Sequence, residues 1–171
     1  MHFLLIVLRL LHIGLGVFWA GAFFFVFRFL MPSLRDAGPA ASGKVMQGVM
    51  ARRFPTIMPI AAILTIVSGL ALMWVTSGGF APIWTRSRMG MTLMTGGGAA
   101  ILAFLIGMIV VRPATLRLPV LGQAAEQLTG ADRDAKLAEF KTLEQKVATG
   151  NAIVAALLGV AVIAMAVARY L

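Results

Sequence analysis

The sequence has little of what soluble proteins and most metal sites depend on. It contains no cysteine in 171 residues, which excludes disulfides, iron–sulfur clusters, thiolate metal sites and cysteine nucleophiles. Its two histidines, His2 and His12, leave little material for a zinc site. Charged residues make up only 12% of the chain and apolar residues 60%, whereas a soluble domain has about 25% and about 45–50%. This composition excludes a soluble enzyme and a disordered chain, and it predicts an integral membrane protein.

Acidic residues are scarce too. Six Asp and Glu stand against fifteen Lys and Arg, for a net charge of +9. Basic clusters such as Arg52-Arg53 lie at the ends of apolar runs, where positive charge sets membrane topology, so we expect no nucleic-acid partner. No acidic residue lies within an apolar run, which argues against a proton-coupled transporter with intramembrane carboxylates.

Four apolar runs are long enough to cross a bilayer, because about 20 helical residues span a hydrocarbon layer of about 30 Å. Uniformly apolar runs of this length are helices, since backbone groups in lipid must bond one another. The expected spans are residues 3–31, closed by Pro32; 55–75; 89–111, stopped by Arg112-Pro113; and 147–168. The first run lacks the basic start of a signal peptide, so we expect it to be retained. We therefore expect an all-α integral membrane four-helix bundle, one domain over residues 1–171, without an internal repeat.

The distribution of Lys and Arg predicts the orientation of these spans. The face with the termini and the second loop carries four of the fifteen, namely Arg9, Arg86, Arg88 and Arg169, and the other eleven lie on the opposite face. The positive-inside rule then places loops one and three in the cytoplasm and both termini on the outer side. We expect a multi-pass protein of a bacterial cytoplasmic (inner) membrane, in contact with the lipid bilayer.

The third loop, residues 112–146, is predicted to contain a helix. Thr129 and Asp132 have the spacing of a capping box, which places the helix start near Gly130. Apolar residues then recur on one face, and Asp132 and Lys136 form an i,i+4 pair. We expect this helix to run on into the fourth span, either as a solvated cytoplasmic extension or as a docking surface for a partner.

His12 is the clearest candidate for a functional site, because ionisable groups within a span are costly. It lies about 13 Å along the helix from Phe3, well inside the bilayer. A neutral imidazole can ligate haem iron. Gly16, one turn deeper, would give a porphyrin room, while Arg9 and Arg88 would reach its propionates. The alternative is a histidine bonded to a backbone carbonyl or to a Ser or Thr across the bundle.

A second axial ligand cannot be His2, which ten residues of helix separate from His12 by about 15 Å. Met91 and Met94 are the plausible candidates, as in cytochromes with His/Met ligation. They flank the glycines at 96–98, which predict either close packing of a neighbouring helix or a flat ligand against bare backbone.

Several motifs carry a family resemblance over residues 8–112. They are Leu11-His12-Ile13, Phe18-Trp19-Ala20-Gly21, Arg28-Phe29-Leu30 and Arg52-Arg53-Phe54, followed by Pro59, Thr65, Gly69, Trp84 and Arg88. This pattern resembles the J-type protoporphyrinogen oxidase family and the copper-resistance protein D-like membrane proteins. The resemblance implies that His12 is a haem b ligand. Arg88 stands where the J-type family has its functional lysine, and arginine does not serve as a proton acceptor, so haem binding is expected rather than that oxidase activity.

Three functions follow as hypotheses. The first is a small haem-b protein in electron transfer or porphyrin chemistry, with His12 as the metal ligand and Arg9, Gly16, Arg88 and Met94 around the cofactor. The second is copper handling, with methionine thioethers as soft ligands for Cu(I). The third is a non-catalytic accessory subunit that packs against other membrane subunits or forms a homo-oligomer.

Overall fold

The computed structural model describes residues 2–171, apart from the side chains of residues 39, 40 and 42. All regular structure in this part of the chain is helical. In chain order the elements are α1 (His2–Phe25), the π-helical segment η1 (Val26–Leu30), α2 (Met31–Asp36), α3 (Gly38–Ala51), α4 (Phe54–Thr76), α5 (Pro82–Thr85), α6 (Arg88–Ile106), the π-helical segment η2 (Gly107–Val111), α7 (Arg112–Glu126), α8 (Gly130–Val167) and the short 3-10 turn η3 (Ala168–Tyr170).

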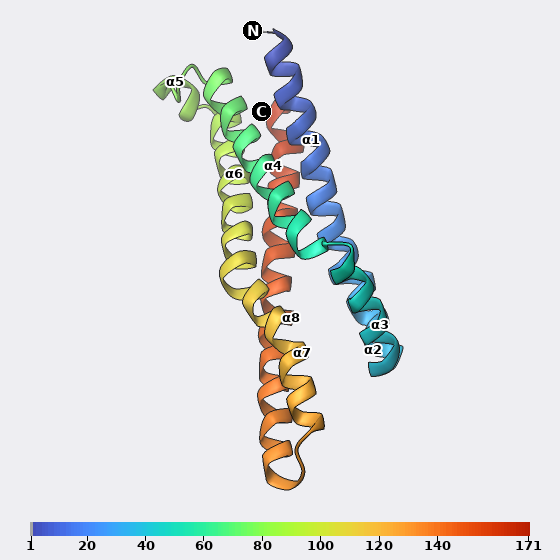
Figure 1. Cartoon of the computed structure of the whole chain (residues 1–171). Helices are drawn as coiled ribbons and strands as arrows, with labels where there is room; N and C mark the ends of the chain where they lie inside the picture. The colour runs from blue at the N-terminus through green and yellow to red at the C-terminus, as the bar shows by residue number, and fades with distance from the viewer. Residues whose placement is uncertain (1) are drawn as a thin grey trace.

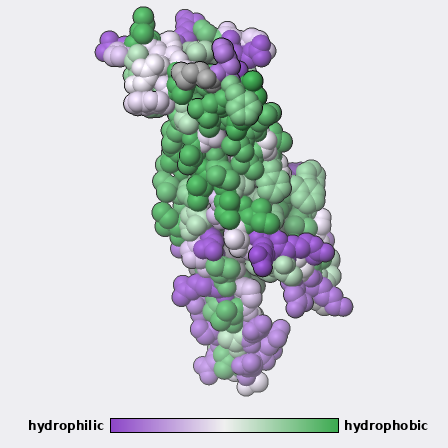
Figure 2. Space-filling view, turned by 45° about the horizontal axis from the view of Figure 1, so that its top comes forward, coloured by the Kyte–Doolittle hydropathy of each residue, from purple (hydrophilic) through white to green (hydrophobic). Residues whose placement is uncertain are grey.

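Within residues 2–171, four helices are long and apolar enough to cross a membrane, which confirms the predicted all-α architecture. Both termini and α5 lie at one end of the bundle, which we call the terminal end, and the α2–α3 and α7–α8 hairpins lie at the other, the hairpin end (Figure 1). A broad apolar belt separates the hydrophilic surfaces of the two ends (Figure 2). This belt is the surface expected to face lipid.

The helices continue past the prolines that were expected to close them, so those two predicted stops are wrong. Pro32 and Pro113 are each the second residue of a new helix, where the missing proline N–H costs no hydrogen bond. A π-helical segment precedes each proline, and its wide turn is closed by Met31 N–H on Val26 O and by Arg112 N–H on Gly107 O.

The two π-helical segments follow the first long helix of each half of the chain. η2 begins 81 residues after η1, at Gly107 against Val26, and Pro113 follows Pro32 at the same interval. In the first half, residues 2–76, α1 packs on α4; in the second half, residues 82–170, α6 packs on α8. Contacts within each pair are far more extensive than those of α4 with α6 or of α1 with α8. The molecule is thus two helical pairs set side by side, a plan that the sequence did not reveal.

A tightly packed core joins the halves toward the hairpin end. Its buried residues come from α1, α4, α6, η2 and α8, namely Trp19, Ala62, Ala103, Val111, Val154 and Leu158. Small residues bring α6 and α8 together, since a Cβ at Gly96 would lie 2.9 Å from Ala164 Cβ and 3.3 Å from Ala161 O. Close approach of this kind is what small residues permit in membrane bundles.

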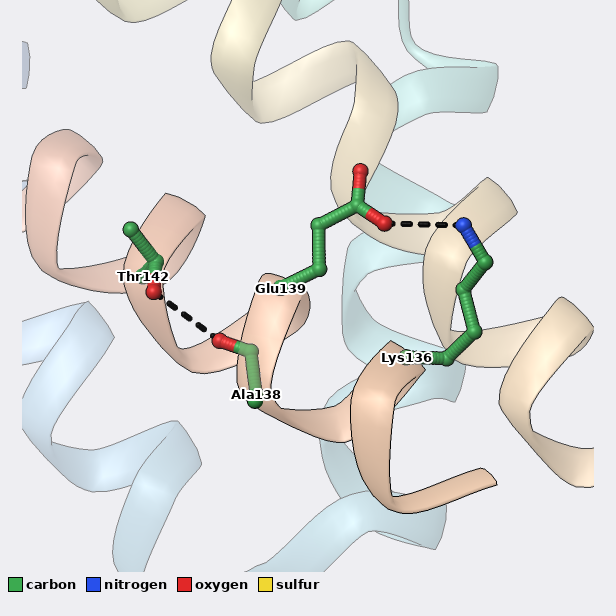
Figure 3. Close-up of polar contacts among 4 residues, drawn as sticks. All are labelled: Lys136, Ala138, Glu139 and Thr142. Atoms are coloured by element: carbon green, nitrogen blue, oxygen red, sulfur yellow. Dashed lines mark hydrogen bonds and ion pairs between the residues drawn. The ribbon is translucent and has the colours of Figure 1, made fainter. Parts of the chain in front are cut away.

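Beyond the expected membrane span, α7 folds back on the first part of α8. α8 begins at Gly130 after Thr129, as predicted, although the Thr129 side chain forms no capping bond. Lys136 pairs with Glu139 at 2.8 Å rather than with Asp132 (Figure 3). The hydrogen bond and charge of Lys136 lower the pKa of Glu139 below 4.5, its ordinary value. Lys136 therefore pairs with Glu139, three residues after it, and not with Asp132, four residues before it, as the sequence had predicted.

Candidate functional site

His12 lies half-buried on α1 and bonds α4. Its Nδ1 is 2.8 Å from the backbone oxygen of Thr65, which is buried. A carbonyl oxygen only accepts, so the proton is on Nδ1, and a neutral ring then leaves Nε2 with a free lone pair. This is the orientation in which metal-ligating histidines are commonly held.

Gly69 provides the space for the imidazole ring. A Cβ at this position would lie 2.6 Å from His12 Cε1 and 2.8 Å from Nδ1, closer than real atoms approach. Gly69 is one helical turn beyond Thr65, so both residues belong to the face of α4 that receives the ring. The bare backbone at Gly69 and the Thr65 carbonyl together fix where the imidazole lies.

The ring borders a cavity of about 30 Å³ to which all four spans contribute. The lining residues are His12 of α1; Thr65, Ile66, Gly69, Leu70 and Met73 of α4; Gly97, Ala100 and Ile101 of α6; and Met165 of α8. This volume has room for one or two water molecules or for a bare metal ion. Three of the lining residues have side chains that can ligate a metal ion, namely His12 through its imidazole and Met73 and Met165 through their thioethers.

The cavity lies between the two halves, with tight packing on one side and aromatic side chains near the other. The buried core lies toward the hairpin end, about 10 Å along α1 from His12 at Trp19. Toward the terminal end, Trp74 meets Phe80 edge-on with ring centres 5.6 Å apart, and Phe80 meets Trp84 at 6.4 Å. The site therefore lies toward the terminal end of the bundle.

The structure brings few of the other predicted site residues to His12. Arg9 and Arg88 are exposed, and neither lines the cavity. Met94 is half-buried on α6 but is also absent from the lining. Gly16 lies against α4, where a Cβ would come within 3.3 Å of Thr65 Cγ2, so the space beside it holds a methyl group.

Sequence reasoning missed Met73 and Met165 and named Thr65 and Gly69 only through the family resemblance. The available signal was spacing: Thr65, Gly69 and Met73 are four residues apart and share one face of a span. Met165 gave no such signal, because its place beside the cavity depends on how α8 packs against α6.

Across residues 2–171, no three His, Asp or Glu side chains gather in a way that would hold a metal ion. A metal at His12 would therefore depend on the thioethers. No family model, curated protein or solved structure matches this chain.

Proposed function

We propose that the protein is a copper-handling membrane protein that binds Cu(I) in the cavity at His12. The observation that carries the proposal is that His12, Met73 and Met165 all line one cavity of about 30 Å³. Soft thioether and imidazole donors select Cu(I) among biological cations. A univalent ion also suits a site without carboxylates, because it brings less uncompensated charge into an apolar surrounding.

The His12–Thr65 bond gives the proposed site its geometry. Because Nδ1 donates to the backbone, Nε2 is the ring nitrogen left for the ion. Met73 and Met165 have long, unbranched side chains, so their sulfur atoms can adjust to a bound ion without moving the helices. A site made of His12, Met73 and Met165 would bind and release Cu(I), or transfer an electron through the bound copper.

Haem b at the same histidine is the second candidate, supported by the orientation of His12 and by the resemblance to the J-type family. A porphyrin does not fit in a cavity of about 30 Å³. Haem binding at His12 therefore requires α4 and α6 to separate.

A copper titration tests the proposal. The chain, purified in detergent under reducing conditions, should take one Cu(I) per molecule in competition with a colorimetric Cu(I) chelator. His12→Ala, Met73→Leu and Met165→Leu should each weaken binding by about tenfold or more. Met94→Leu is the matched control, because Met94 lies outside the cavity, and it should bind like the parent chain.

Two results would overturn the copper proposal. One is binding that His12→Ala leaves unchanged, and the other is a Soret band in the purified protein that His12→Ala abolishes, which would favour haem. Purification as part of a larger assembly, with neither metal nor haem, would favour the accessory-subunit hypothesis.

By the positive-inside rule, we place the terminal end, and with it the site, toward the outer face of a bacterial inner membrane, with loops one and three in the cytoplasm.

A further inference from the structure

The helices within each half pack closely, and their contacts involve glycine and small side chains. In the first half, α1 meets α4 at Gly16 and Thr65; in the second half, α6 meets α8 at Gly96, which faces the backbone oxygen of Ala161. A Cβ at Gly150 would lie 2.7 Å from Val111 Cγ2, so α8 is also fitted closely to η2. Such contacts involve little that is flexible, and each half should therefore behave as one body.

The boundary between α4 and α6, which we call the seam, is packed differently. Near the terminal end, a Cβ at Gly97 would lie 3.1 Å from the terminal methyl group of Met73, the end of a flexible side chain. The cavity lies on the same seam, and Leu70, which lines it, is exposed. Methionine side chains repack readily, so little resists a change of spacing here.

The seam is closed at the hairpin end and hinged at the other. The buried core holds Ala62 of the first half against residues of the second. At the terminal end the halves are connected by residues 77–81, where Gly78 and Gly79 have φ of 65° and 77° and Phe80 has φ of 61°. α5 is held to the start of α6, because a Cβ at Gly90 would collide with the Trp84 backbone. The connection before α5 is a hydrogen-bonded turn, with Gly79 N–H on Trp74 O and Ala81 N–H on Ser77 O, and a rotation of α4 would have to be taken up there.

We propose that the two halves part along the seam at the terminal end, and that this opening is the route by which a ligand reaches His12. The nature of the ligand, Cu(I), rests on the proposed function, whereas the movement itself does not. The core at the hairpin end stays closed, so the cavity opens toward one side of the membrane only. A wider opening of the same seam would admit a planar molecule such as a porphyrin.

Spin labels test the movement without any ligand, since the chain has no native cysteine. Thr76→Cys with Thr95→Cys reports across the seam, and Thr95→Cys with Ile163→Cys reports within the second half. In lipid nanodiscs the seam pair should give a broad distance distribution that changes with Cu(I), while the within-half pair stays narrow. Equal, narrow distributions for both pairs would overturn the proposal.

A cross-link tests the route. Leu70→Cys and Ile101→Cys, joined by a short bifunctional thiol reagent, should slow Cu(I) loading about tenfold or more, because the open state is removed. The control is Gly122→Cys with Phe140→Cys, a contact within the second half, which should load at the rate of the unlinked chain. An unchanged rate in the Leu70–Ile101 variant would overturn the route. An absence of Cu(I) binding in every variant, with a broad seam distribution, would instead count against the proposed function alone.

Discussion

The two halves have similar helix arrangements but carry different side chains at corresponding positions. At the interval of 81 residues that relates η1 to η2, His12 of α1 corresponds to Leu93 of α6, and Gly16 corresponds to Gly97. The first half has a polar contact between its helices, where the Thr65 carbonyl of α4 accepts from His12 Nδ1 of α1 at 2.8 Å. The second half has alanine and glycine in closest contact. The first half thus contributes His12 and Met73 to the cavity, and the second half contributes Met165 on a closely packed pair of helices.

Replacing His12 with the residue of the second half should have the largest effect. His12→Leu gives both halves a leucine at this position. It also removes the imidazole that borders the cavity. We expect Cu(I) binding to be lost, a drop of more than about a hundredfold if the ring is a direct ligand. Chelator competition measures this, and Leu93→Ala, at the corresponding place in α6, should bind as the parent does.

Adding a methyl group at Gly96 should expose the tighter packing of the second half. Its Cβ would meet Ala164 Cβ and the Ala161 backbone, neither of which can rotate away. We expect Gly96→Ala to lower the free energy of unfolding by about 1–3 kcal/mol, measured by denaturant titration in detergent. Gly98→Ala is the matched control, since nothing lies within 4 Å of its Cβ. A loss of the same size at Gly98 would contradict the assignment.

The same change in the first half should act on the site rather than on the fold. The three atoms nearest to a Cβ at Gly69 all belong to the His12 ring, which can rotate away at the loss of its bond to Thr65. Gly69→Ala should therefore weaken Cu(I) binding while costing about 1 kcal/mol of stability, the value of one hydrogen bond. Unchanged binding would show that the ring position is not set by Gly69.

The ion pair between the halves should matter least. Arg35 of α2 lies 3.5 Å from Glu144 of α8, and both side chains are largely exposed to solvent. Exposed pairs contribute about 0.2–1 kcal/mol, so Arg35→Ala and Glu144→Ala should each shift stability within that range, and less at high salt. A double-mutant cycle measures the coupling, and a value well above this range would show that the hairpins hold the halves together.

The fold was predictable from sequence because length and hydropathy alone decide what crosses a bilayer. The four spans and the start of α8 at Gly130 follow from such local signals. The helix stops at Pro32 and Pro113 were predicted wrongly, since a π-helical turn can precede a proline without ending the helix. Among the site residues, the importance of His12 was visible as an isolated ionisable group. Met73 and Met165 were not, because methionine is common in apolar spans and only packing between helices distinguishes the two that line the cavity with His12.

The unbroken course of α8 has a mechanical consequence. α1 and α6 are each followed by a π-helical segment, whereas α8 runs as one α-helix from Gly130 to Val167, 38 residues or about 57 Å. Its first residues stand at the tip of the α7–α8 hairpin (Figure 1), and Met165 lies two residues before its last residue, Val167. A tilt of α8 that displaced the hairpin tip would therefore also displace Met165 and change the lining of the cavity.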